Sequence, residues 1–236
     1  MTAVFFEVPA SGGSRPGEPD PPGLRPAPAP GPLVNAPWPV VALVVTIVLG
    51  YLLQSRFPLE SVTQWLAFSP ALLLEGHPER MITSVFVHGN WAHALMNAAF
   101  ILAFGAPVAR FFGPSVGGSL DFFLFYLFCG VLACAGFAAL HWGQNVSLIG
   151  ASGAASGLMG GAARLIGGNG RVGPIFSRAV TGMGLGWLIV NIIMAFAGGL
   201  LVPGGGSAAV GWEAHLTGFV VGVLLIEPFG WVARRR

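Results

Sequence analysis

Apolar residues in this chain gather into six stretches, separated by breaks that contain polar residues, glycine or proline. The stretches approach the length of about 20 residues that a helix needs to cross the hydrocarbon core of a bilayer. In that environment every backbone polar group must be paired internally, which requires helices or a closed barrel. The pattern predicts an all-α fold, a polytopic membrane bundle of six transmembrane helices near residues 38–53, 91–108, 122–140, 150–166, 180–201 and 214–232.

Two regions fall outside this pattern. Residues 54–90 contain only apolar runs that are too short to cross a bilayer, so we expect this segment at the membrane interface. Residues 1–36 are dense in proline, glycine, alanine and serine, a composition that disfavours both a regular helix and a packed core. We therefore predict a disordered, proline-rich tail at residues 1–36 and a membrane domain at residues 37–236.

Composition and charge agree with a membrane protein. Charged residues make up 8% of the chain and hydrophobic residues 54%, with a mean hydropathy of +0.75, whereas soluble domains are about 25% charged. All eleven basic residues are arginine, and they form no basic face of the kind that binds nucleic acid. With six spans, nine of the eleven arginines fall on the side of the two termini.

This asymmetry predicts the orientation of the chain, because cytoplasmic loops carry an excess of basic residues. Both termini are expected in the cytoplasm. We expect a bacterial plasma (inner) membrane, since no organelle-targeting segment is evident. The opening residues of the fourth and sixth stretches then lie at the non-cytoplasmic side.

Those opening residues include a serine and a histidine. Ser152 stands between glycines, in Gly150-Ala151-Ser152-Gly153, and His215 opens the sixth stretch. A reactive polar residue at membrane depth is a functional-site hypothesis by default, and a serine becomes a nucleophile when a neighbouring base takes its proton. Small residues four apart on each helix, Gly153 before Gly157 and Gly218 before Gly222, would let the two helices approach closely enough.

An anion site would complete the chemistry of an acyl transfer. At the start of its helix, Ser152 has unpaired backbone N–H groups and the positive end of the helix dipole nearby. His93 and Asn97 are four residues apart on the second stretch, so they share a helix face and offer two further donors. These four side chains predict a hydrolase with a serine nucleophile.

Simpler interpretations remain open at this stage. A serine in a glycine-rich transmembrane helix commonly bonds to its own backbone, and Asn97 alone could join two helices. His88 and His93 could be interfacial, and His215 could be a core histidine with its hydrogen bonds satisfied. The three histidines could also bind a metal or haem, since imidazole is a common metal ligand. We expect no metal, because no carboxylate or thiolate lies at a compatible depth.

Three short motifs lie in order on the second, fourth and sixth stretches. They are H-xxxx-H-xxx-N from His88 to Asn97, G-A-S-G from Gly150 to Gly153, and A-H-L-T-G from Ala214 to Gly218. Together and in this order, the motifs resemble those of the rhomboid family of intramembrane serine proteases. The resemblance covers roughly residues 78–226.

The resemblance implies a role for each matched position. Ser152 would be the nucleophile and His215 its general base, a dyad without an aspartate. His93 and Asn97 would form the oxyanion hole with the Ser152 backbone N–H, and His88 would support the loop beside the site. Supporting positions are Gly150, Gly153, Ser156 and Gly218. The family uses no metal or cofactor and cleaves transmembrane substrates near the outer face, with small residues at the cut.

Two positions depart from the family pattern. Glu79 stands before Arg80, where a large residue is common, in a segment whose Arg80 and Thr83 otherwise resemble the family's interfacial motif. Ser156 stands four residues after Ser152, where many members carry an aromatic that packs against the catalytic histidine. Ser156 could hydrogen-bond His215 or leave room beside it, and it is a less favoured candidate for the nucleophile.

The sequence therefore predicts a serine endopeptidase that cleaves the transmembrane helices of membrane protein substrates through a Ser–His dyad. Its partners are expected to be transmembrane substrates and membrane lipid, with no nucleic acid. The alternative is a catalytically silent rhomboid-like protein that binds transmembrane helices. A small transporter or metal carrier is disfavoured, because the two halves of the chain show no internal symmetry.

Overall fold

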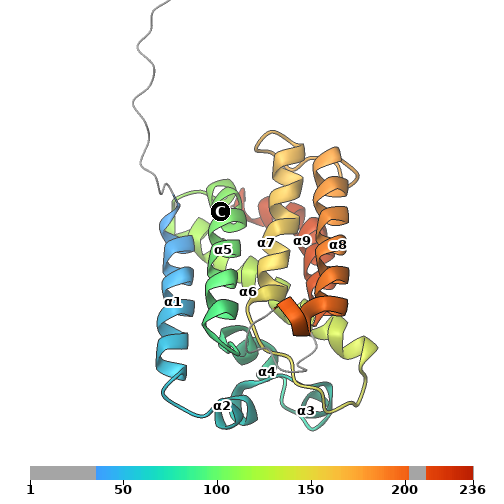
Figure 1. The fold of residues 1–236 in the computed structure, drawn as a ribbon. Helices are drawn as coiled ribbons and strands as arrows, with labels where there is room; N and C mark the ends of the chain where they lie inside the picture. Colours follow the sequence, from blue (N-terminus) through green and yellow to red (C-terminus); the bar gives the residue numbers. More distant parts are fainter. Residues whose placement is uncertain (1–35, 202–210, 236) are drawn as a thin grey trace, which may run out of the picture. The chain divides into compact units, whose positions relative to one another are not determined.

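The computed structural model describes residues 36–201 and 211–235. The tail predicted for residues 1–36 lies outside this part of the chain, except for its last residue. The described residues form long helices that stand side by side (Figure 1), joined at one end by short helices. The long helices are α1 (Trp38–Gln54), α5 (Trp91–Phe112), α6 (Val116–Leu140), α7 (Ser152–Gly167), α8 (Arg178–Leu201) and α9 (Trp212–Ala233).

Each of the six predicted apolar stretches coincides with one of these helices. Four of them, α5, α6, α9 and the Arg178–Phe196 part of α8, are long and apolar enough to cross a membrane. α1 is a shorter apolar helix of 17 residues, and α7 has 16. The described residues thus form an all-helical structure with four candidate membrane spans, and the crossing of the bilayer by all six helices stays a prediction.

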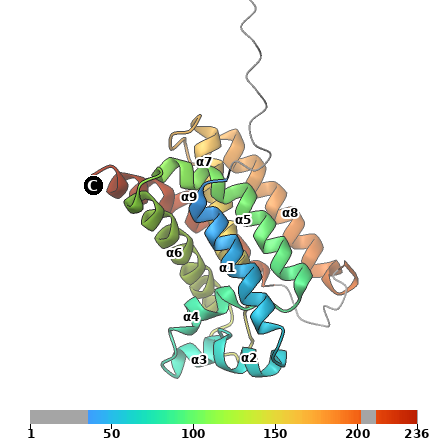
Figure 2. The ribbon, with the colours of Figure 1, turned by 90° about the vertical axis from the view of Figure 1, so that its left-hand side faces the viewer.

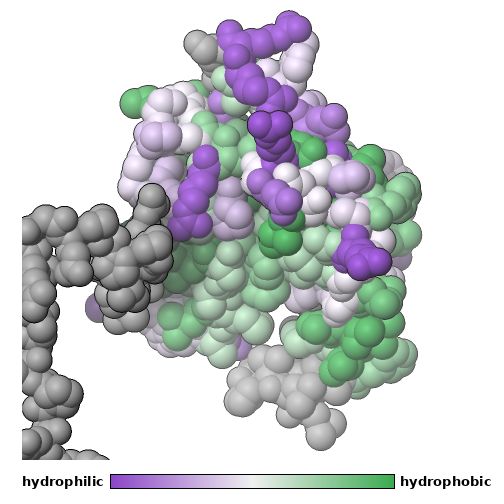
Figure 3. Space-filling model, turned by 90° about the horizontal axis from the view of Figure 1, so that it is seen from above, coloured by the Kyte–Doolittle hydropathy of each residue, from purple (hydrophilic) through white to green (hydrophobic). Residues whose placement is uncertain are grey.

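The bundle has two chemically different ends. Successive long helices run in opposite directions, so one end holds the first residues of α1 and α8 and the last residues of α5 and α9. We call it the arginine end, and hydrophilic residues are spread over this face (Figure 3). Among the described residues, the arginines that belong to it are Arg110, Arg164, Arg171, Arg178, Arg234 and Arg235.

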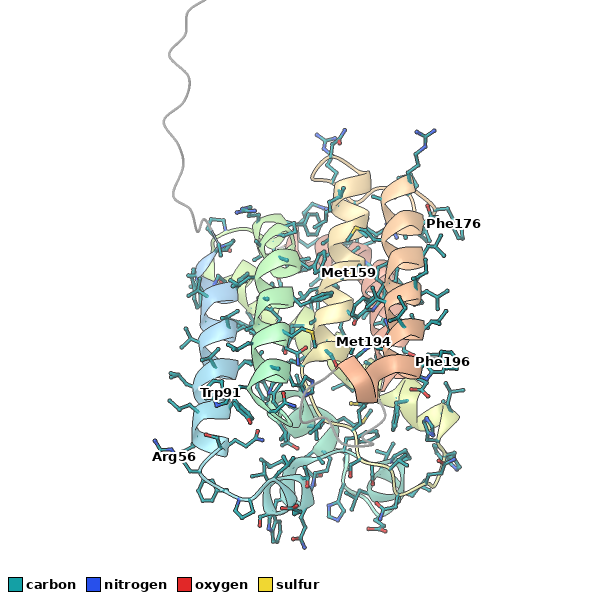
Figure 4. The ribbon with its side chains drawn as sticks, in the orientation of Figure 1. Arg56, Trp91, Met159, Phe176, Met194 and Phe196 are labelled. Atoms are coloured by element: carbon teal, nitrogen blue, oxygen red, sulfur yellow. The ribbon has the colours of Figure 1, made fainter. Side chains whose placement is uncertain are left out.

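The opposite end carries the segment between α1 and α5. Figure 2 shows its short helices beneath the bundle, and Figure 4 places Arg56 at the same end. The short helices are α2 (Leu59–Leu66), α3 (Pro70–Leu74), α4 (Arg80–Thr83) and the 3₁₀ helix η1 (Ser84–Phe86). α7 and α9 begin at this end, so Ser152 and His215 lie at the same level of the bundle.

Side chains of α4 hold this segment together. The Arg80 guanidinium donates to the Gln64 carbonyl at 3.0 Å, and the Thr83 hydroxyl donates to the Leu66 carbonyl at 2.8 Å. Both bonds return to α2, which makes α2 and α4 one compact unit. Glu79, the departure noted above, is more than half exposed, and its carboxylate pairs with Arg80 at 3.5 Å.

α7 is the central helix of the bundle. It packs against α5, α6, α8 and α9, and thirteen of its sixteen residues are buried. Glycine and alanine dominate its sequence, which lets the backbones of neighbouring helices approach. The closest approach is to α9, where a methyl group at Gly222 would lie 1.9 Å from the Gly157 carbonyl oxygen.

α8 lies at the other extreme of burial. In the 18-residue apolar part of α8, only 11% is buried, whereas the corresponding part of the other three candidate spans is 33% to 44% buried. Phe196 and the preceding loop residue Phe176 point away from the bundle on the α8 side (Figure 4), and both are almost fully exposed. In a membrane this face of α8 meets lipid or another transmembrane helix.

A buried arginine ties the arginine end together. Arg164, near the end of α7, is 3% exposed, and its guanidinium donates to the Gly173 carbonyl and to the Val223 carbonyl of α9 at 2.9 Å. A third bond, of 2.8 Å, reaches the carboxylate of Glu227 on α9. Each of the three guanidinium nitrogens thus has an acceptor, and the carboxylate balances the charge, as burial of a guanidinium requires.

Candidate active site

The side chains of Ser152 and His215 meet across the interface of α7 and α9. Ser152 is the first residue of α7 and His215 lies in the first turn of α9, and the distance from Ser152 Oγ to His215 Nε2 is 2.7 Å. The helices can come this close because a methyl group at Gly218 would lie only 2.1 Å from the Gly153 carbonyl oxygen. The structure thus brings together a hydroxyl and an imidazole that are 63 residues apart in sequence.

The backbone just before Ser152 turns sharply at Gly150. Its φ of +113° is in a region that glycine enters without strain, and its N–H donates to the Ser84 carbonyl at 2.9 Å. A Cβ at Gly150 would lie 2.6 Å from His93 Nε2 and 3.6 Å from Asn97 Nδ2. Because glycine has no side chain, this space stays open, and the two nitrogens face it.

His93 is held in one orientation by the start of α5. Asn90 caps the helix by accepting a hydrogen bond from the His93 backbone N–H at 2.8 Å. His93 Nδ1 accepts from the Gly89 N–H at 3.4 Å. A neutral imidazole that accepts at Nδ1 carries its proton on Nε2, so His93 presents a donor toward Gly150.

Asn97 presents the second donor. Its side chain is 4% exposed, and within the described residues its Nδ2 has no hydrogen-bond partner. A buried donor without an acceptor costs about 1–3 kcal/mol and calls for an explanation. An amide held ready for an acceptor that arrives with a substrate is such an explanation, and His93 one turn earlier points its donor to the same place.

His88 supports this region from behind. Its side chain is fully buried, with its ring packed edge-on against His93 at 5.1 Å and Tyr51 at 6.4 Å between ring centres. The His88 backbone is bonded in both directions to the side-chain amide of Gln54. Burial lowers the pKa of His88 to about 4, and a proton on His93 would oppose protonation of His88 further. His88 is therefore neutral at physiological pH.

A small cavity borders the candidate nucleophile. Its volume is about 10 Å³, close to what one water molecule needs. Among the described residues, no group of three or more histidine, cysteine, aspartate or glutamate side chains is arranged to hold a metal ion. The cavity is lined mainly by small residues, among them Ser84, Gly130, Ala133, Gly150, Ser152 and Ala214.

Two side chains of α8 complete the surroundings of His215. Asn191 Oδ1 lies 2.7 Å from His215 Nδ1, and the indole of Trp187 lies against the imidazole with 5.6 Å between ring centres and an angle of 33°. Sequence reasoning missed both residues. The available signal was an asparagine in an otherwise apolar stretch, four residues after a tryptophan.

A comparison with known protein families finds a match. The family profile of the rhomboid domain matches residues 75–231, about two thirds of the chain. The chain belongs to the rhomboid family. No curated protein matches it. The rhomboid match extends from the end of α3 to the last turns of α9, so it includes His88, His93, Asn97, Asn191 and Trp187 together with Ser152 and His215, but not Tyr51 and Gln54 of α1.

Membership makes the chain an integral membrane protein of an intramembrane-protease type of family, whose members act on membrane proteins. Within this rhomboid protein, the departure at Ser156 has a simple geometry. The Ser156 hydroxyl is buried and donates to the Ser152 carbonyl at 2.7 Å, on its own helix. The aromatic ring against His215 comes instead from Trp187 of α8.

Proposed function

We propose that this rhomboid protein is a serine endopeptidase that cleaves transmembrane helices of membrane proteins. The observation that supports the proposal most is the 2.7 Å contact between Ser152 Oγ and His215 Nε2, beside two nitrogen donors that face one point. A serine that served packing alone would bond to its own helix, as Ser156 does. Ser152 instead faces a base.

The proposed reaction is an acyl transfer. Ser152 Oγ attacks the carbonyl carbon of the scissile peptide bond while His215 Nε2 takes the hydroxyl proton. The carbonyl oxygen becomes an oxyanion, which accepts hydrogen bonds from the Ser152 N–H, His93 Nε2 and Asn97 Nδ2. His215 then returns the proton to the leaving amine, and an acyl-enzyme ester remains on Ser152.

A water molecule completes the cycle. His215 takes one of its protons as the oxygen attacks the ester. The second tetrahedral intermediate then collapses to a carboxylic acid as His215 returns this proton to the leaving Ser152 Oγ, which restores the free enzyme. The peptide bond of an intact helix is shielded and its backbone groups are paired, so the substrate must unwind locally before attack. Helix-breaking or small residues near the cut favour this step.

The cavity beside Ser152 suggests what the cleavage site contains. With about 10 Å³ of space and a lining of small residues, it admits a side chain of about the size of alanine. We expect substrates with alanine or glycine before the cut to be preferred over those with leucine or phenylalanine. A series of substrates that differ only at this position, analysed by product mass, tests the expectation.

The site's place in the membrane follows from the charge distribution. The arginine end holds six of the eight described arginines, and Ser152 and His215 lie at the other end. By the positive-inside rule we place the arginine end in the cytoplasm of a bacterial plasma membrane, with six helices across the bilayer and the cut near the outer face. Cysteine accessibility at each end, measured in intact cells, tests this orientation.

The decisive experiment compares three proteins in liposomes with a model transmembrane substrate. Wild type is expected to cleave it and to react with a fluorophosphonate, whereas Ser152→Ala does neither. Ser156→Ala is the matched control, since it removes a neighbouring hydroxyl that does not face His215, and it is expected to retain both activities. A folded wild type that neither cleaves nor reacts would support a catalytically silent helix-binding protein instead.

A further inference from the structure

The second ring nitrogen of His215 has a partner that belongs to neither α7 nor α9. Asn191, on α8, is 1% exposed, and its Oδ1 lies 2.7 Å from His215 Nδ1. Its other polar atom, Nδ2, donates to the Trp187 carbonyl at 2.8 Å. The amide nitrogen is therefore engaged on its own helix, and the oxygen is the atom left to face His215.

This arrangement determines where His215 carries its proton. Asn191 Oδ1 can only accept, so the neutral imidazole must donate from Nδ1–H. Nε2 is then unprotonated and can accept the hydroxyl proton of Ser152. The other tautomer would place a proton between Nε2 and the serine and leave Nδ1 without a donor for Asn191, so it cannot act as a base toward Ser152.

We propose that Asn191 is a positioning residue that holds His215 in the tautomer and ring orientation that activate Ser152. This inference rests on the proposed function, since it assigns the support of the same base. It replaces the two-residue dyad by a hydrogen-bonded chain, Ser152–His215–Asn191, whose members come from three helices. Asn191 does not touch the substrate and acts through His215.

Trp187 reinforces the same restraint. It precedes Asn191 by one helical turn, and its ring lies against the His215 imidazole while Phe100 of α5 packs behind it at 4.9 Å between ring centres. The ring contact limits rotation of the imidazole about its side-chain bonds, and the bond to Asn191 selects its direction. α8 thus provides the support that Ser156 on α7 is too small to give.

Three variants separate this role from a structural one. Asn191→Ala and Asn191→Leu both remove the acceptor, and Leu also fills the volume of the amide. Asn191→Asp keeps an oxygen that can accept from His215 and removes the amide donor to Trp187. The readouts are the second-order rate constant of fluorophosphonate labelling at Ser152, which needs no natural substrate, and the unfolding temperature in detergent.

We expect Ala and Leu to slow labelling by about 10- to 100-fold, as for other side chains that orient a functional histidine, and Asp to restore most of the rate. Labelling of Ala and Leu at the wild-type rate would overturn the inference and leave the protease assignment intact. An Asp variant as slow as Ala, with an unchanged unfolding temperature, would overturn it too, because the bond to Trp187 would then be what matters. A folded wild type without labelling would instead refute the proposed function.

Discussion

The contact between α7 and α9 can be tested by adding one methyl group, far from the reacting atoms. In Gly222→Ala the new Cβ would lie 1.9 Å from the Gly157 carbonyl oxygen, and contacts of a real Cβ are not shorter than 3.0 Å. The obstacle is backbone on both sides, so no side chain can rotate away. The two helices must separate here by at least the difference, 1.1 Å.

The separation reaches the candidate site through rigid helices. Ser152 lies five residues from Gly157 and His215 seven residues from Gly222, or about 7.5 and 10.5 Å along the helix axes at 1.5 Å per residue. A parallel displacement would lengthen the 2.7 Å contact between Oγ and Nε2 to about 3.8 Å, beyond the range of a hydrogen bond. A misplacement of about 1 Å can reduce a rate about 100-fold.

We therefore expect Gly222→Ala to lower cleavage of a model transmembrane substrate about 100-fold and to destabilise the bundle by about 1–3 kcal/mol, as overpacking does. Initial rates in liposomes and unfolding in detergent measure the two effects. The matched control is Gly50→Ala on α1, where a Cβ would meet nothing within 4 Å. Cleavage by Gly222→Ala within twofold of wild type, or an equal loss in Gly50→Ala, would refute the reasoning.

Three further predictions concern single side chains. The pKa of about 4 for His88 lies below its ordinary value of 6.5, so the unfolded chain binds the proton first as pH falls. The contribution of His88 to stability should be constant above about pH 6.5 and fall by about 3 kcal/mol toward pH 4; the difference between wild type and His88→Asn, in unfolding followed between pH 4 and 8, measures this contribution. Asn97→Ala should reduce cleavage about 100- to 1,000-fold without loss of stability, because its buried Nδ2 has no partner among the described residues; an unfolding temperature well below that of wild type would contradict this account. Arg164→Met should cost about 1–3 kcal/mol for each buried carbonyl that loses its donor, one in the 168–173 loop and one in α9, in an unfolding measurement. Glu227→Gln should cost less than about 1 kcal/mol because that carboxylate is 64% exposed; equal losses in the two variants would show that the ion pair, and not the carbonyl bonds, matters.

Hydropathy was sufficient to locate the long helices, because apolar length is what a bilayer selects. It was less informative about α7. This helix is only 16 residues long and is enclosed by four others, so its length is set by protein contacts and not by the thickness of the hydrocarbon core. Sequence alone does not reveal that enclosure, and for this reason the number of spans stays a prediction.

The residues of the candidate site also differ in whether the sequence alone could reveal them. Ser152, His215, His93 and Asn97 could be named because each opens or follows the opening of a helix at one end, where their depth can be counted along the chain. Asn191 and Trp187 lie within α8, which is apolar on every side. Because this helix has no polar face, the sequence does not predict how it is rotated about its own axis. The direction of the Asn191 side chain is therefore known only from the packing of α8 against its neighbours.

The candidate site of this rhomboid protein is built from helices that differ in how tightly they are packed. Ser152 and His215 are joined by the most tightly packed pair of helices, whereas the side chains behind His215 come from α8, the candidate span with the least buried surface. Little packing opposes an outward movement of α8, and such a movement would withdraw Asn191 and Trp187 while the serine and histidine stay together. The serine and the histidine would then keep their contact while the base loses the side chains that support it.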